Sequence, residues 1–219
     1  MLPCYYEAND TTENHIYHLT PGKRTLTKEE LQQEHLLVEA AKKQPRRFGV
    51  LYERYYEQIF LFVFKRVDQE ESAADVTSQV FLKAMSNLKK YQFRGVPFSA
   101  WLYRIAINEV NQYFREAKSK RAISMKSSDI ADIMDEVEEL PQDDNIQQML
   151  ASLQLLRPDE LQMIELRFFE KLAFKEIAEI YNITENNAKV RMYRLLGKMK
   201  KMMAGDSQKS GVRRTQSGV

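Results

Sequence analysis

Residues 174–196 read FKEIAEIYNITENNAKVRMYRLL, and this stretch predicts a helix-turn-helix whose second helix is basic. Ile177, Ala178 and Tyr181 fall on one face of a short first helix. Asn182 suits the tight turn that follows, because asparagine tolerates the left-handed backbone conformation better than most residues do. Thr184 is a favourable N-cap for the second helix.

The second of these helices concentrates positive charge. Six lysines or arginines and no acidic residue lie between Lys189 and Lys201. Helical spacing predicts that Ala188 and Met192 turn inward, which leaves the basic side chains outside. A basic helix after a tight turn is typical of a recognition helix, which presents cations to phosphates and a few side chains to base edges. The plainer alternative is a solvated amphipathic helix, but the cap, the turn and the spacing together favour DNA binding.

The composition predicts an almost wholly helical protein. Of 219 residues, 43% are hydrophobic, and there are only seven glycines and six prolines. The net charge of +2 is unevenly spread, since residues 48–121 carry twelve basic and eight acidic side chains and residues 145–204 carry ten and seven. Residues 122–144 carry one lysine and eight acids. Two basic segments are therefore joined by an acidic tether, and local charge of this kind matters for nucleic-acid contact.

Several classes of site are disfavoured by what the chain lacks. Cys4 is the only cysteine, so no disulfide framework or thiolate metal cluster can form within one chain. The histidines, His15, His18 and His35, precede the segment that we expect to fold, which disfavours a histidine metal site. No signal peptide or membrane-spanning apolar run is evident. We therefore expect a cytoplasmic protein with no metal, no cofactor and no membrane insertion.

Breaks in the apolar spacing divide the chain into five segments, and its length suits one large or two small domains. We expect a partly disordered N-terminal extension (1–45), a helical bundle (46–121), an acidic linker (122–144), a helical domain with the helix-turn-helix (145–204) and a disordered tail (205–219). The predicted fold class is all-α, with two small helical domains joined by the linker.

Two local patterns within these segments bear on the later argument. Thr27 and Glu30 form a capping box, which predicts a helix that reaches Lys43. The stretch Tyr91–Ser99, YQFRGVPFS, contains a glycine and a proline and is predicted to be a loop.

Two strings of the first bundle, ADVTSQVFLKA at 74–84 and FSAWLYRIAIN at 98–108, resemble the conserved second region of bacterial RNA polymerase sigma factors. The string EIAE at 176–179, with the basic helix after it, resembles their fourth region. Order, spacing and the short acidic tether resemble the compact extracytoplasmic-function (ECF) type. The resemblance implies a protein without catalytic residues that binds core RNA polymerase, directs it to promoters and helps to melt the minus-ten element.

The resemblance implies a polymerase-binding face on the helix that we expect from Ser72 to about Leu88. In the family this face grips the clamp helices of the large polymerase subunit. A helical face that is half apolar and half polar suits contact with a coiled coil. Without the resemblance, an ordinary solvated face would be the preferred interpretation. The residues that match are Asp75, Ser78, Gln79 and Leu82.

The loop from Phe93 and the helix after it resemble the part of the family that recognises the minus-ten element in melted, single-stranded form. Trapping an extruded base requires a mobile loop, aromatic rings and amide or hydroxyl groups. Either Phe93 or Phe98 fits a role in the core equally well, and Trp101 is expected to be a core residue. The candidates are Phe93, Phe98, Ser99 and Asn108 for the base, and Arg94, Arg104, Arg115 and Lys118 for the sugar–phosphate backbone.

The fourth region is expected to bind the minus-thirty-five element as duplex DNA. Asparagine can pair with adenine edges and arginine with guanine edges. The candidates are Asn186, Asn187, Lys189, Arg191, Arg194 and Lys198. The acidic linker resembles the segment that threads the polymerase cleft, although a solvated tether fits the sequence equally well. The family also implies an anti-sigma factor as a partner.

Three other functions compete with this interpretation. A stand-alone helix-turn-helix regulator usually needs a dimer interface or a ligand domain, and the sequence contains no pattern typical of either. A nucleic-acid enzyme would need framed metal-binding carboxylates or a histidine near a nucleophile, whereas the dense acids lie in the linker. A module that only sequesters a partner would leave the basic helix without a purpose.

Overall fold

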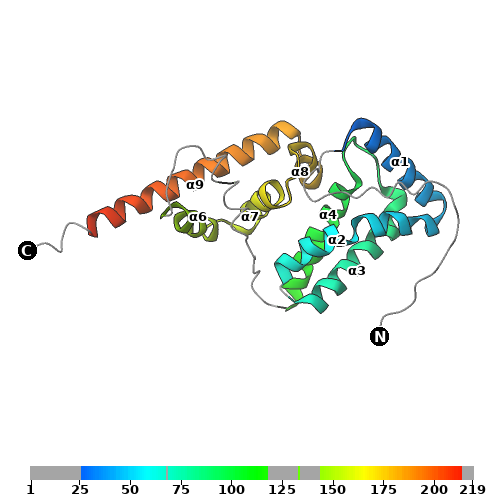
Figure 1. The fold of residues 1–219 in the computed structure, drawn as a ribbon, viewed down its shortest axis with the longest axis horizontal. Helices are drawn as coiled ribbons and strands as arrows, with labels where there is room; N and C mark the ends of the chain where they lie inside the picture. Colours follow the sequence, from blue (N-terminus) through cyan, green and yellow to red (C-terminus); the bar gives the residue numbers. More distant parts are fainter. Residues whose placement is uncertain (1–25, 68, 118–132, 134–143, 214–219) are drawn as a thin grey trace, which may run out of the picture.

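The structure is a computed structural model that describes residues 26–67, 69–117, 133 and 144–213. Throughout those ranges the regular structure is helical and no strand occurs, in agreement with the all-α prediction. Figure 1 shows two groups of helices, α1 to α4 and α6 to α9, that lie against each other. The expected disorder of residues 1–25 and 214–219, and most of the linker, fall outside the described residues.

The first group is a bundle built around α2, the most apolar of its helices. Leu51, Ile59 and Phe62 of α2 are fully buried and pack against α3 and α4. The helix α3 begins at Glu70, slightly before the start that the sequence predicts. The elements are α1 (Lys28–Lys43), η1 (Pro45–Arg47), α2 (Phe48–Val67), α3 (Glu70–Asn87), η2 (Leu88–Lys90) and α4 (Phe98–Ala117).

The helix α1 forms as predicted and belongs to this bundle. Its capping box is present, because the Glu30 N–H donates to Thr27 Oγ1 and the Thr27 N–H donates to Glu30 Oε2. Val38 and Ala41 are buried against α2. The first domain therefore includes a helix that the sequence analysis assigns to the N-terminal extension.

The second group contains the helix-turn-helix. Asn182 adopts the left-handed conformation, with φ 52° and ψ 48°, and Thr184 Oγ1 accepts a hydrogen bond from the Asn187 N–H at 3.2 Å. Both observations confirm the predicted turn and cap. Helix α9 continues to Arg213, whereas the sequence analysis expects a disordered tail from residue 205. The elements are α6 (Asp144–Gln154), α7 (Pro158–Ile164), the π-helical turn η3 (Glu165–Phe169), α8 (Phe174–Tyr181) and α9 (Glu185–Arg213).

The two groups contact each other through α4 and α8, and through buried charges that join α2 to η3. Arg66 donates to Glu165 at 2.5 Å, and both side chains are nearly fully buried. Glu170 accepts from Lys65 at 3.2 Å and from the Tyr103 hydroxyl at 2.8 Å. The contact between the two groups therefore includes buried ion pairs, within an apolar core that continues from one group to the other.

Candidate nucleic-acid and polymerase interfaces

The outer face of α9 carries the cations that the sequence predicts. Ala188 and Met192 have no exposed surface, while Arg191 and Arg194 are exposed. Asn186 and Asn187 lie exposed in the first turn. Helical periodicity thus separates a buried apolar side from a solvent-facing side with arginines and amides, which are the groups that pair with base edges in a major groove.

Two of the side chains on α9 are already held in place. The Arg191 Nε–H donates to Asn187 Oδ1 at 2.9 Å, and Lys189 pairs with Glu185 at 2.7 Å. Each pair links neighbouring turns of the helix, so the polar heads have restricted orientations before any ligand arrives. A preorganised donor loses less conformational entropy when it binds.

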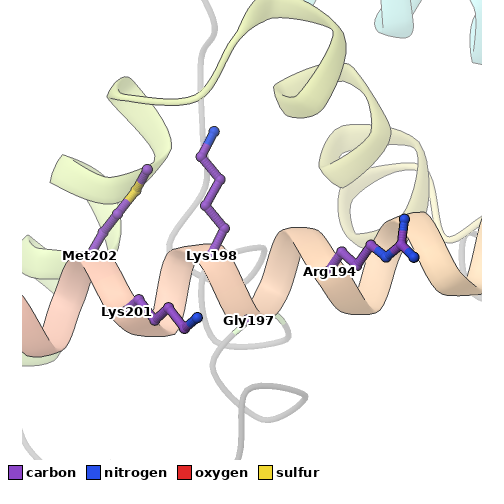
Figure 2. A pocket seen from close by; sticks show the side chains of 5 residues that line it. All are labelled: Arg194, Gly197, Lys198, Lys201 and Met202. Carbon is purple, nitrogen blue, oxygen red and sulfur yellow. The ribbon is translucent and has the colours of Figure 1, made fainter.

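Lys198 has a second role, which the sequence analysis does not predict. Its ammonium group donates to both carboxylate oxygens of Glu160 on α7, at 2.9 and 2.7 Å. This hydrogen bond lowers the pKa of the Glu160 carboxyl. Figure 2 shows Lys198 and Met202 rising from the same side of α9, toward the neighbouring helices. Lys198 therefore links α9 to α7 by an ion pair. It also lines an open concavity of about 600 Å³, together with Arg194, Gly197, Lys201 and Met202.

Val190 and Tyr193 are exposed on α9 among the cations, with 38% and 58% of their surface accessible. Neither residue is among the contacts that the sequence predicts. The signal that could have found them is an apolar side chain at an outward position of a basic helix. Apolar groups at such positions can contact the methyl group of thymine.

The face of α3 has the mixed character that the sequence predicts. Asp75, Ser78 and Gln79 are exposed, and Leu82 is 50% exposed. Met85, which the sequence analysis does not name, extends the apolar part and is 44% exposed. The four predicted residues thus share one accessible helical face.

The loop between η2 and α4 is held by contacts from two other helices. The rings of Phe93 and His35 are stacked, with centroids 4.6 Å apart and planes inclined by 15°. Gly95 has φ 69°, a conformation that favours glycine, and its carbonyl accepts from Lys175 of α8 at 2.7 Å. Arg94 Nη1 lies 3.5 Å from Glu179 Oε2, also on α8. A DNA contact by Arg94 therefore requires this ion pair to open.

Phe98 and Ser99 are buried, which corrects their assignment as DNA-contacting residues. Phe98 has no exposed surface and packs with Tyr55, Tyr91 and Trp101, at centroid distances of 6.0, 5.1 and 5.4 Å. Ser99 is only 5% exposed. Of the two roles that the sequence allows for Phe98, the structure shows the core role. Phe93 remains partly accessible, and Trp101 packs against the core as expected.

The outer face of α4 presents Arg104, Asn108 and Arg115, all of which are exposed. They are spaced by four and seven residues, so they share one side of the helix beyond the loop. Lys118, the last predicted contact, lies outside the described residues.

None of the described helices combines the length and the apolar character that crossing a bilayer requires. Within the described ranges, no group of three or more His, Cys, Asp or Glu side chains is arranged to hold a metal ion.

Comparison with known families assigns these two groups of helices. A family model described as Sigma-70 region 2 matches residues 51–120, and one described as Sigma-70 region 4 matches residues 146–199. The chain belongs to the sigma-70 factors. Both matches fall on the segments identified above: the first spans α3, the loop and α4, and the second spans the helix-turn-helix.

Curated relatives indicate that this sigma factor is of the ECF type. The ECF RNA polymerase sigma factor BldN of Streptomyces coelicolor is 27% identical over 166 residues, which are 74% of this chain and 62% of that protein. The ECF RNA polymerase sigma factor SigX of Bacillus subtilis is 24% identical over 184 residues, 78% of this chain and 94% of that protein. The chain thus spans less than two thirds of BldN and nearly all of SigX.

A solved structure of CnrH in complex with the cytosolic domain of CnrY has a similar fold. The TM-score is 0.50 at 20% identity, covering 79% of this sigma factor and 98% of that chain. The region 2 match begins at residue 51, so α1 of this sigma factor lies before it.

Proposed function

We propose that this sigma factor binds core RNA polymerase, directs it to specific promoters and helps to melt the minus-ten element. The proposal rests on the observation that one chain has two kinds of accessible face. One is the partly apolar, partly polar face of α3, and the other is the basic face of the helix-turn-helix. A stand-alone duplex-binding regulator needs only the second face. Because the polymerase supplies the chemistry, this role requires no catalytic residue of the sigma factor.

Polymerase binding is assigned to the α3 face of Asp75, Ser78, Gln79 and Leu82. The exposure of all four residues supports this assignment. Leu82 and Met85 supply the apolar part, and the polar residues surround it, as in protein interfaces with an apolar centre and a polar rim. The partner is a clamp helix pair of the large polymerase subunit.

Recognition of the minus-thirty-five element is assigned to the exposed side of α9, which enters the major groove of duplex DNA. Asn186, Asn187 and Arg191 face the base edges, and Lys189 and Arg194 face the phosphates. Val190 extends this surface toward a thymine methyl group. Lys198 contributes little to DNA binding in this proposal, because its ammonium group is already paired with the Glu160 carboxylate.

Melting of the minus-ten element is assigned to the loop and to α4. Opening one base-pair step costs about 1.4 kcal/mol of stacking, whereas one base stacked on an aromatic ring returns roughly 1–3 kcal/mol. A single ring, Phe93, can therefore offset about one step. Asn108 is proposed to bond the edge of the captured base, while Arg104, Arg115 and Lys118 hold the strand. Arg94 joins them once it leaves Glu179.

An anti-sigma factor is proposed as a further partner, because free sigma factors of this type are often held inactive by one. The proposed site of action is the bacterial cytoplasm, where the chromosome and the polymerase are found.

The test of the function is co-elution of the purified full chain with bacterial core RNA polymerase in size-exclusion chromatography at moderate salt. We expect a stable complex that then retards promoter DNA more strongly than either component alone. Absence of a complex, with the chain shown by circular dichroism to be helical, would reject polymerase binding. In that case a stand-alone DNA-binding protein would be the better description.

A further inference from the structure

The helix α1 contacts the loop of residues 91–98, between η2 and α4, at its start, its middle and its end. Lys42 Nζ donates to the Tyr91 carbonyl at 2.8 Å, at the start of the loop. The His35 ring stacks on Phe93 in the middle. Glu34 Oε2 accepts from the Phe98 N–H at 2.5 Å, where the loop ends and α4 begins. One face of α1 thus follows the whole loop.

Glu34 is the buried centre of these contacts. It is 1% exposed, and both of its carboxylate oxygens are occupied, since Oε1 accepts a hydrogen bond from the Tyr55 hydroxyl. Arg54 Nη1 lies 3.8 Å from the same oxygen. A carboxylate is costly to bury unless it is paired and hydrogen-bonded. Three groups from α2 and α4 reduce this cost in part, and together they determine the position of Glu34 narrowly.

The bond to Phe98 makes Glu34 a cap for α4 that is supplied from another helix. Phe98 is the first residue of α4, and the first N–H groups of a helix lack an acceptor within the helix. A negative group at that end also interacts favourably with the helix dipole. Glu34 therefore fixes where the loop stops and where the helix with Arg104 and Asn108 starts.

His35 orders the ring that is proposed to receive the extruded base. A loop aromatic with free rotamers must lose side-chain entropy when a base stacks on it, and that loss weakens binding. The stack with His35, at 4.6 Å and 15°, restrains the Phe93 ring while leaving it partly accessible. The ring is thus held ready before DNA arrives.

We propose that α1 is a positioning element for minus-ten recognition: Glu34 and His35 hold the 91–98 loop in the conformation in which Phe93 receives an extruded base. This inference rests on the proposed function of the loop. It assigns to α1 a part in promoter opening, although α1 lies before the region 2 match and touches no DNA itself.

The test uses holoenzyme reconstituted from core polymerase and full-length variants. The probe is a duplex that the wild-type holoenzyme selects from a random-sequence library, and strand opening is measured by permanganate reactivity of unpaired thymines. The variants are His35→Ala, His35→Phe, Glu34→Ala and Glu34→Gln. Glu29→Ala serves as the matched control, because Glu29 is exposed in the first turn of the same helix.

We expect His35→Ala to lower the opening equilibrium roughly two- to ten-fold, the worth of one aromatic pair. Glu34→Ala should lower it roughly ten- to a hundred-fold, the worth of a hydrogen bond to a charged group. Phenylalanine at 35 restores a flat ring, and glutamine at 34 restores an acceptor for Phe98, so both should recover most of the opening. Polymerase affinity and the Glu29→Ala variant should remain at the wild-type level.

Two outcomes would overturn the inference. One is normal opening by both alanine variants. The other is a joint loss of opening, polymerase affinity and helicity that neither His35→Phe nor Glu34→Gln repairs, which would give α1 a structural role only. Failure of the wild-type holoenzyme to select or open any duplex is a separate result, and it would reject the proposed function itself.

Discussion

Replacing Glu34 by glutamine should remove a pH dependence of stability that is unusual for a carboxyl group. Burial raises the pKa of Glu34 from 4.5 to about 7, against the hydrogen bond from Phe98 and the charge of Arg54, which favour the ionised form. Glu176 on α8 disfavours ionisation as well. In the unfolded chain the pKa of this carboxyl returns to its ordinary value.

The sign follows from where the proton binds more tightly. Between pH 4.5 and about 7 the folded state keeps the Glu34 proton that the unfolded state has lost. Stability from this group is therefore fully present below the unfolded pKa, and it is lost as the pH rises through the folded pKa. Each pH unit between the two values is worth about 1.4 kcal/mol. The wild-type protein should lose about 3 kcal/mol, relative to Glu34→Gln, from about pH 4 to about pH 8.

The assay is urea unfolding of both proteins at matched pH values, followed by tryptophan fluorescence. The chain has one tryptophan, Trp101, whose ring lies 5.4 Å from that of Phe98, so the signal comes from the bundle that contains Glu34. Other titrating groups are common to both proteins and cancel in the difference. Glu29→Gln, an exposed change on the same helix, should follow the wild type. Parallel curves for wild type and Glu34→Gln would refute the reasoning, because Glu34 would then ionise as an exposed carboxyl does.

Four further predictions concern the interfaces and the contact between the two regions. Asp75→Lys combined with Gln79→Ala should weaken co-elution with core polymerase and leave the unfolding curve unchanged; unchanged affinity would remove α3 from the interface. Arg191→Ala should cost about 1–3 kcal/mol in selection of the preferred duplex while polymerase binding persists, and equal loss of both would indicate misfolding. In the full chain, duplex affinity should fall with a log–log salt slope of about −0.9 per phosphate contacted, and a flat response in filter binding would argue against groove binding. Glu165→Gln should destabilise the protein in urea by about 3–5 kcal/mol, because Arg66 is left buried without its charge partner, whereas a joint apolar replacement of both should recover most of that loss.

The features that the sequence predicts correctly are governed by neighbours within four residues. The turn at Asn182, the cap by Thr184 and the capping box of Thr27 each depend on backbone groups one turn away. Such interactions are encoded in short spacing, so residue types and intervals suffice to find them. The inward and outward sides of α9 follow from the same periodicity.

The features that the sequence does not predict depend on residues far apart in the chain. Phe93 and Phe98 occupy one loop without periodicity, so the sequence cannot tell which ring enters the core. Phe98 is the ring that enters the core, where it packs against Tyr55 of another helix and its N–H donates to Glu34, 64 positions earlier. Lys198 resembles any outward lysine of a basic helix, and only the packing of α7 brings Glu160, 38 positions earlier, within bonding distance. Tertiary partners of this kind leave no local pattern.

The contact between the two regions bears on how the sigma factor would engage a promoter. As their names imply, the minus-ten and minus-thirty-five elements lie roughly 25 base pairs apart, or on the order of 85 Å along a duplex. Helices α4 and α8, which carry or adjoin the two proposed DNA-binding surfaces, are in direct contact in this structure. Simultaneous recognition therefore requires the regions to separate, and separation also frees Arg94 from Glu179.

Separation also exposes the pair between Arg66 and Glu165 to water. Rehydration of two charges recovers much of the Coulombic energy that their contact supplied, so a buried ion pair resists opening less than an apolar interface of similar size. Buried charges at this interface thus lower the cost of separation relative to an interface of the same size that is entirely apolar.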